Sequence, residues 1–113
     1  MEEQFPKVIT VHAKDSGGVI ELTAADIVVV IFQENPSCGV VLELIKKPDR
    51  DKLMLLKEEE WTPPGVHASG IGWQYWVFFS KRQGEAVAEF QKYSEGTPDK
   101  RITYRFDIKK RII

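Results

Sequence analysis

The segment Trp73-Gln74-Tyr75-Trp76-Val77-Phe78-Phe79-Ser80 decides the fold class, because its side chains alternate with a period of two. Successive side chains of a β-strand point to opposite faces, so every second residue from Trp73 to Phe79 lies on one face and the residues from Gln74 to Ser80 lie on the other. The last segment repeats this period: in 102–109 we expect the even-numbered residues to face inward and the odd-numbered ones to face solvent. Both segments predict strands of a β-protein.

Shorter segments elsewhere in the sequence predict further strands. We expect an edge strand in 7–14, a short strand in 19–22, a central strand buried on both sides in 27–32 and another strand in 40–45. Residues 53–60 and 85–93 have compositions that also suit a helix, but packing in a β-sandwich would make them strands. Turn signals separate the segments, and residues 94–100 are expected to form a loop. Seven or so short strands with such turns predict an all-β sandwich or barrel.

The composition suits one globular domain over residues 1–113, since 42% of the residues are hydrophobic and 29% are charged. The longest apolar run, 27–32, is far shorter than the roughly 20 residues of a membrane span. No secretory signal opens the sequence. We therefore expect a soluble protein without a membrane partner, and a cytoplasmic one if the sequence is full length.

The charge is nearly balanced, with 16 Lys and Arg against 17 Asp and Glu. Nucleic-acid-binding proteins usually carry a basic surplus, so we expect no nucleic-acid partner. The basic run Lys109-Lys110-Arg111 is interpreted as a solvated strand end.

Candidate catalytic and metal-binding residues are few. Cys38 is the single cysteine, and His12 and His67 are far apart, so the sequence predicts no disulfide, no metal site and no cofactor. Nothing in the sequence places a histidine beside Cys38, as a catalytic pair would need. Glu58-Glu59-Glu60 is interpreted as a solvated strand end, because consecutive strand residues point to opposite faces. We therefore expect that the protein is not an enzyme.

Three predicted loops carry the more informative motifs. In Asn35-Pro36-Ser37-Cys38-Gly39 the proline and the glycine favour a narrow, stiff tip, and a stiff loop loses little entropy on entering a cleft. With Val40 this segment resembles the Asn-Pro-Thr-Thr-Gly-(aromatic) loop of the chagasin family, which inhibits papain-like cysteine proteases. Three further segments resemble that family's motifs in the same order. They are Trp61-Thr62-Pro63-Pro64 (aromatic-x-Pro-Pro), Gly70-Ile71-Gly72 (Gly-x-Gly-Gly) and 90–96 (Tyr-x-Arg-Pro-Trp-x-Gly).

This resemblance implies an immunoglobulin-like antiparallel β-sandwich of about seven to eight strands, with three loops at one end. It implies a monomeric, reversible inhibitor whose partner is a papain-family cysteine protease, with the first loop in the active-site cleft and the other two at its sides. The implied contacts are, in the first loop, Asn35, Pro36, Ser37, Cys38 and Gly39; in the second, Gly70, Ile71 and Gly72; in the third, Lys92 and Gly96. Trp73 and Tyr93 are candidate aromatic anchors.

Departures from the family's motifs keep alternatives open. Tyr93-Ser94 stands where the family has Pro-Trp, and aromatic residues are enriched among binding hot spots. The alternative is an immunoglobulin-like interaction or carbohydrate-binding module without inhibitory activity. Cys38 replaces a threonine: it is either a small side chain tolerated at the tip or a thiol able to form a mixed disulfide with the target.

Overall fold

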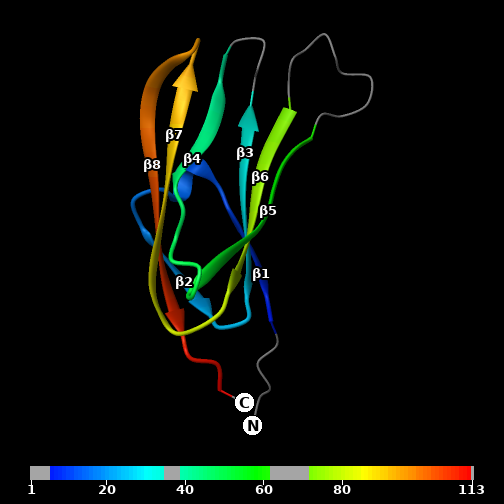
Figure 1. Ribbon diagram of the computed structural model, residues 1–113, viewed down its shortest axis with the longest axis vertical. Coiled ribbons are helices and arrows are strands. Elements are labelled where there is room, and N and C mark those ends of the chain that lie inside the picture. Colours follow the sequence, from blue (N-terminus) through cyan, green and yellow to red (C-terminus); the bar gives the residue numbers. More distant parts are fainter. Residues whose placement is uncertain (1–5, 35–38, 62–71, 113) are drawn as a thin grey trace.

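The computed structural model describes residues 6–34, 39–61 and 72–112, and in them the chain forms eight strands and one short 3₁₀ helix (Figure 1). The strands are β1 (Val8–Val11), β2 (Val19–Thr23), β3 (Ile27–Glu34), β4 (Val41–Lys46), β5 (Leu53–Trp61), β6 (Gly72–Ser80), β7 (Gly84–Ser94) and β8 (Thr97–Lys109). The helix η1 spans Ala13–Asp15. No helix in the described ranges has the length and apolar composition needed to span a membrane.

The strands form two sheets that pack face to face as a sandwich. Sheet A has the order β1-β3-β6-β5, and sheet B has the order β2-β8-β7-β4 (Figure 1). The predicted all-β sandwich is therefore confirmed. The sheets are mixed rather than wholly antiparallel, because β1 runs parallel to β3 and β2 runs parallel to β8. Parallel neighbours need a crossover connection, and here the chain passes through β2 of sheet B between β1 and β3.

The core lies between the inner faces of the two sheets, and its largest side chains come from β6, β7 and β8. The predicted inward residues of the last strand, from Ile102 to Ile108, are at most 2% exposed. Trp76 packs edge-on against Phe90 with ring centroids 4.8 Å apart, and Phe90 packs in the same way against Tyr104 at 5.7 Å. Such aromatic pairs stabilise a fold by roughly 0.5–1.5 kcal/mol beyond the area they bury.

The structure confirms two of the segment predictions and corrects two others. Residues 53–60 and 85–93 lie in β5 and β7, so packing does override their helical composition, as expected for a sandwich. The expectation that 27–32 is buried on both sides is wrong. Val28 and Val30 are fully buried, whereas Val29 on the opposite face is partly exposed. The first strand is also shorter than predicted, since it ends at Val11 and is followed by η1.

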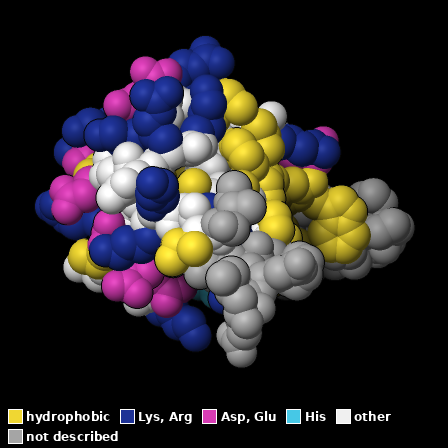
Figure 2. Space-filling view, turned by 90° about the horizontal axis from the view of Figure 1, so that it is seen from below, with side chains coloured by type: hydrophobic (Ala, Val, Ile, Leu, Met, Phe, Trp, Pro, Cys, Tyr) yellow, Lys and Arg dark blue, Asp and Glu magenta, His cyan; other side chains and the backbone are white. Residues whose placement is uncertain are grey.

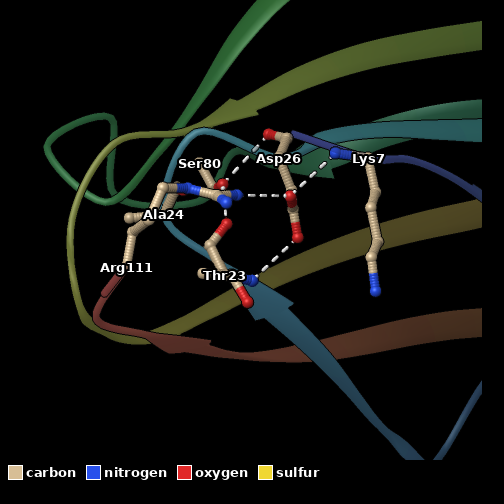
Figure 3. A network of polar contacts seen from close by, with 6 residues as sticks. All are labelled: Lys7, Thr23, Ala24, Asp26, Ser80 and Arg111. Atoms are coloured by element: carbon tan, nitrogen blue, oxygen red, sulfur yellow. Dashed lines mark hydrogen bonds and ion pairs between the residues drawn. The ribbon is translucent and has the colours of Figure 1, made fainter. Parts of the chain in front are cut away.

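The end of the sandwich that carries the chain termini is held by a buried carboxylate (Figure 3). Asp26 is 2% exposed, and its Oδ1 accepts a hydrogen bond from the Lys7 backbone N–H at 3.0 Å. Its Oδ2 accepts one from the Thr23 backbone N–H at 2.9 Å. The same Oδ1 lies 2.8 Å from Nη2 of Arg111. Asp26 thus joins the start of β1, the end of β2 and the residues after β8, and so links both sheets.

The position of Arg111 corrects one sequence interpretation. Its side chain is 14% exposed, and its Nε donates a hydrogen bond to the Ala24 carbonyl, so it is not part of a solvated strand end. On the other side of the same turn, the Ser80 hydroxyl donates to the carbonyls of Thr23 and Asp26, at 2.9 and 3.0 Å (Figure 3). The turn between β2 and β3 is therefore fixed by β6 and by the C-terminal residues together.

Candidate functional site

The strand ends that flank the three predicted loops lie at one end of the sandwich, opposite the termini (Figure 1). β3, β5 and β7 end there, and β4, β6 and β8 begin there. Six of the implied contact residues, Asn35, Pro36, Ser37, Cys38, Gly70 and Ile71, lie outside the described residues. The others, Gly39, Gly72, Trp73, Lys92, Tyr93 and Gly96, all lie at this end, which we call the loop end.

Gly39 joins the first predicted loop to the third. Its carbonyl accepts a hydrogen bond from the Glu95 backbone N–H at 3.1 Å. Its φ of +70° is in the left-handed region, which favours glycine. A Cβ added at Gly39 would lie 2.7 Å from Cα of Glu95, too close for any other residue without a backbone shift. Glycine is therefore required here for two independent reasons, the backbone conformation and the close approach.

The third predicted loop is a tight hairpin rather than the longer loop expected over 94–100. Ser94 pairs with Thr97, and the two residues between them, Glu95 and Gly96, have φ of 54° and 77°. Two positive φ values in a two-residue connection are typical of a type I′ turn, whose twist matches that of the strands. β8 therefore starts at Thr97, and a register shift accommodates Pro98 opposite Tyr93.

Lys92 and Tyr93 consequently lie in β7 and not in a loop. The Nζ of Lys92 is 3.6 Å from the Asp99 carboxylate, with 31% of the lysine side chain exposed. Phe90 is buried and Lys92 pairs with the buried Leu42, so both face inward, and Tyr93, next to Lys92, lies on the outer face of sheet B. Partial desolvation and then the nearby Glu43 carboxylate raise the pKa of the Tyr93 phenol.

Gly72 and Trp73 belong to the other sheet. Gly72 pairs with Glu34, the last residue of β3, and Trp73 pairs with Trp61, the last residue of β5. Trp73 shares the partly exposed face of β6 with Tyr75, since the intervening Gln74 is buried. The two candidate anchors, Trp73 and Tyr93, therefore lie on opposite outer faces of the sandwich and flank the loop end from both sides.

Gln74 ties the two sheets together beneath the loop end. Its Oε1 accepts a hydrogen bond from the Leu42 backbone N–H at 2.8 Å, and its Nε2 donates to the Leu42 carbonyl at 2.9 Å. Leu42 lies in β4, an edge strand of sheet B, whereas Gln74 lies in sheet A. Sequence reasoning assigned Gln74 no role, although its place on the inward face beside Trp76 was the signal for a polar contact in the interior.

Glu34 is a second buried polar residue that sequence reasoning missed. It is 3% exposed at the end of β3, and its Oε2 has no hydrogen-bond partner within the described part of the chain. Burial, and secondarily the Glu60 carboxylate, raise the pKa of Glu34 above its ordinary value of 4.5. Glu34 is an even-numbered residue of β3, like the buried Val28 and Val30, and this alternation was the sequence signal that it faces inward. A carboxylate thus lies directly beneath the first and second predicted loops.

Substitution of Glu34 by glutamine is expected to stabilise the protein at neutral pH. A raised pKa means that the folded protein holds this proton more tightly than the unfolded chain, so deprotonation of Glu34 favours unfolding. The free energy of unfolding of Glu34→Gln should therefore exceed that of the wild type at pH 8. The difference should shrink as the pH falls to 4 and below, where the carboxyl is protonated in both states.

Urea unfolding of wild type, Glu34→Gln and the exposed control Glu58→Gln across this pH range measures the effect. A Glu34→Gln variant that is less stable than the wild type at pH 8, or whose effect does not depend on pH, would contradict the expectation.

The described residues contain no group of three His, Cys, Asp or Glu side chains that could hold a metal ion. Glu58, Glu59 and Glu60 are exposed along β5, as the sequence indicated. The Glu59 carboxylate accepts a hydrogen bond from the Tyr75 hydroxyl and lies 3.2 Å from Nζ of Lys57. What the described loop end offers is a set of fixed backbone turns with aromatic side chains on either flank.

Comparison with known proteins identifies the fold. No protein-family model matches the chain, and no curated protein matches it in sequence. Among solved structures, the cysteine protease inhibitor EhICP2 from Entamoeba histolytica is similar with a TM-score of 0.76 and 12% identity, covering 94% of this chain and 99% of that chain. Amebosin is similar with a TM-score of 0.61 and 12% identity, covering 93% of this chain and 100% of that chain.

A third similar structure is PbICP-C, solved in complex with falcipain-2. Its TM-score is 0.56 and its identity 10%, and the match covers 98% of this chain and 96% of that chain. At these identities the likeness concerns the fold. The immunoglobulin-like sandwich implied by the chagasin-family resemblance is confirmed, and cysteine protease inhibitors are among the proteins that share it.

Proposed function

We propose that this protein is a reversible inhibitor of papain-like cysteine proteases and that it blocks the protease active-site cleft with its loop end. The observation that carries this proposal is the convergence of the strand ends that flank the three predicted loops, with Gly39 of the first loop hydrogen-bonded to Glu95 of the third. The shared fold with EhICP2, itself described as a cysteine protease inhibitor, supports it.

The proposed mechanism is steric occlusion by a preorganised surface. The Gly39–Glu95 hydrogen bond, the Glu95-Gly96 hairpin and the Gln74–Leu42 bonds fix the bases of the loops before any partner binds. Residues that are already fixed lose little conformational entropy on binding, which increases affinity. An interface of about 800 Å² per partner is typical of protease–inhibitor complexes. Asn35, Pro36, Ser37, Cys38 and Gly39 would enter the cleft, with the Gly70–Gly72 segment and the Lys92–Gly96 hairpin at its sides.

A second candidate is an immunoglobulin-like interaction or carbohydrate-binding module without inhibitory activity. The observation that favours it is the third turn: its tip is Glu95-Gly96, and the adjacent aromatic residue, Tyr93, lies on a strand face rather than at the tip. Such a protein would keep the scaffold and bind through an outer face.

Titration of papain, a cathepsin-L-like protease and falcipain-2 with this protein, followed with a fluorogenic peptide, tests the proposal. We expect stoichiometric and reversible inhibition of at least one of these enzymes. The double variant Ser37→Arg/Cys38→Arg should lose it, whereas the control Gln83→Arg, in the exposed turn between β6 and β7 at the opposite end, should retain it. Absence of inhibition of all three enzymes at micromolar concentration would favour the binding module.

A further inference from the structure

The outer face of sheet A is apolar over most of its area. Its apolar side chains are outward-facing residues of the four strands: Val8 on β1, Ile27, Val29 and Ile31 on β3, Trp73, Tyr75, Val77 and Phe79 on β6, and Met54 and Trp61 on β5. The polar residues on this face are Thr10 on β1, Gln33 near the end of β3, and Lys57 and Glu59 on the edge strand β5. Val8 is 69% exposed and Trp61 is 51% exposed. Figure 2 shows hydrophobic side chains gathered on the side of the sandwich that sheet A forms, with charged side chains over much of the remaining surface.

Sheet B differs in this respect. The outward residues of β8 include Arg101, Arg105, Asp107 and Lys109, and those of β7 include Glu85 and Glu89. An antiparallel sheet with one solvated face normally alternates apolar and polar residues, as β8 does. The strands β3 and β6 do not, since both of their faces are apolar. Sheet A is therefore patterned as a sheet with a partner on each face.

The size of this face is that of a small protein interface. Three of its four strands have eight or nine residues and β1 has four. With a spacing of about 4.8 Å and a rise of about 3.3 Å per residue they cover roughly 500 Å². The largest apolar patch on a typical monomer is about 300–600 Å² and is often functional. Two such faces packed on each other would bury about 1,000 Å² in total, which is the lower end of the range for specific interfaces.

The two edges of the face carry opposite charges near the loop end. On β5 the acidic residue of this face is Glu59, which pairs with Tyr75, whereas Glu58 and Glu60 pair with the inward-facing Trp76 and Gln74. Glu59 is exposed, is level with Ile31 because both pair with Tyr75, and lies 3.2 Å from Nζ of Lys57. On the other edge, Val11 pairs with Val30, so the residues that follow it continue toward the loop end. There the exposed Lys14 lies beside Trp73, with which it lines the same depression. The neighbouring Asp15 carboxylate is turned to the His12 backbone N–H, at 2.8 Å.

We infer that this protein forms a dimer in which the outer faces of two copies of sheet A pack on each other about a two-fold axis parallel to the strands. This axis places β1 of one copy over β5 of the other at equal height, so Lys14 of one copy lies opposite Glu59 of the other. A two-fold axis makes the contact twice, because the same patch serves on both copies.

The same axis gives Trp61 a place to bind. An apolar hollow of about 420 Å³ lies between His12, Ile31, Trp61, Trp73 and Tyr75. The exposed Trp61 of one copy would lie opposite His12 of the other, across this hollow, and buried tryptophans are frequent hot spots of interfaces. The dimer differs from the monomer that we expect from sequence, and it does not rest on the proposed function.

Sedimentation velocity from low micromolar to submillimolar concentration tests the dimer. Val77 and Val87 offer a matched pair, since both are partly exposed valines on the outer face of an inner strand, the first in sheet A and the second in sheet B. We expect wild type and Val87→Lys to dimerise with increasing concentration and Val77→Lys to remain monomeric.

Charge reversal provides a second test of the dimer. It substitutes only exposed side chains, so the fold stays intact. Lys14→Glu should raise the dissociation constant of the dimer about tenfold or more, and Lys14→Glu/Glu59→Lys should restore it. A wild type that stays monomeric at every concentration would overturn the inference. Dimerisation of Val77→Lys equal to that of Val87→Lys, or a Lys14→Glu variant that dimerises like the wild type, would overturn it as well.

Discussion

Substitution of Asp26 by alanine is expected to lower the free energy of unfolding by about 3–5 kcal/mol, the cost of removing one partner from a buried ion pair. The variant leaves the guanidinium of Arg111 without its carboxylate, where the arginine side chain is 14% exposed. It also removes the acceptor of the backbone N–H groups of Lys7 and Thr23. A loss of this size is a large share of the total stability of a small domain.

Asp107→Ala is the matched control, because it breaks an ion pair on the surface. Asp107 lies 2.8 Å from Nζ of Lys109, but the two side chains are 31% and 60% exposed. Exposed pairs stabilise by at most about 1 kcal/mol. Urea unfolding of both variants at neutral pH gives the comparison, and similar losses in the two would show that the Asp26 network does not stabilise the fold as described.

Substitution of Gly39 by alanine is expected to weaken protease inhibition by roughly a hundredfold, the effect of losing a binding hot spot. The added Cβ would collide with the Glu95 backbone and separate the first predicted loop from the third. We also expect a loss of stability of about 3 kcal/mol, of which about 1–2 kcal/mol is the cost of a left-handed conformation in a residue with a side chain.

Two other glycines separate backbone strain from collision. Gly17 and Gly96 have φ of +87° and +77°, and no atom lies within 4 Å of a Cβ added at either position. Gly17→Ala should lose about 1–2 kcal/mol and keep full inhibition. Inhibition constants and unfolding curves measured together make the test decisive: if Gly39→Ala and Gly17→Ala behave alike, the junction between the two loops has no part in inhibition.

The fold could be predicted from the sequence because most of its strands carry one-dimensional signals. The alternation in 73–80 and 102–109 reports burial on one face, which depends only on nearest neighbours along the strand. Residues 53–60 and 85–93 were ambiguous alone and became strands through the context of the other strands. The parallel pairing of β1 with β3 and of β2 with β8 could not be predicted from such local signals. It depends on which distant strand each short strand is hydrogen-bonded to.

The position of the candidate site at one end of the sandwich could be predicted from the sequence, whereas the secondary structure of some of its residues could not. The order of the motifs located the loop end, where the structure places Gly39, Gly72 and Gly96. Lys92 and Tyr93 were assigned to a loop, because the polar and proline-containing segment after them gave no sign that pairing resumes at Thr97.

The residues that hold this scaffold together were not predictable as such. Asp26, Glu34, Gln74 and Arg111 act through partners as much as 87 residues away or through burial, and a local pattern does not contain that information.

The pairing of β8 has a consequence for how the chain acquires its structure during synthesis. β8 is hydrogen-bonded to both β7 and β2, and Val19 lies opposite Arg105, so the second strand lacks its partner until the last one exists. The Tyr104 hydroxyl donates to the His12 carbonyl across 92 residues. Chains dominated by such distant contacts fold slowly, on a scale of about milliseconds to seconds. A nascent chain whose β8 is still inside the ribosome therefore has an incomplete sheet B, and the sandwich can be completed only once β8 has emerged.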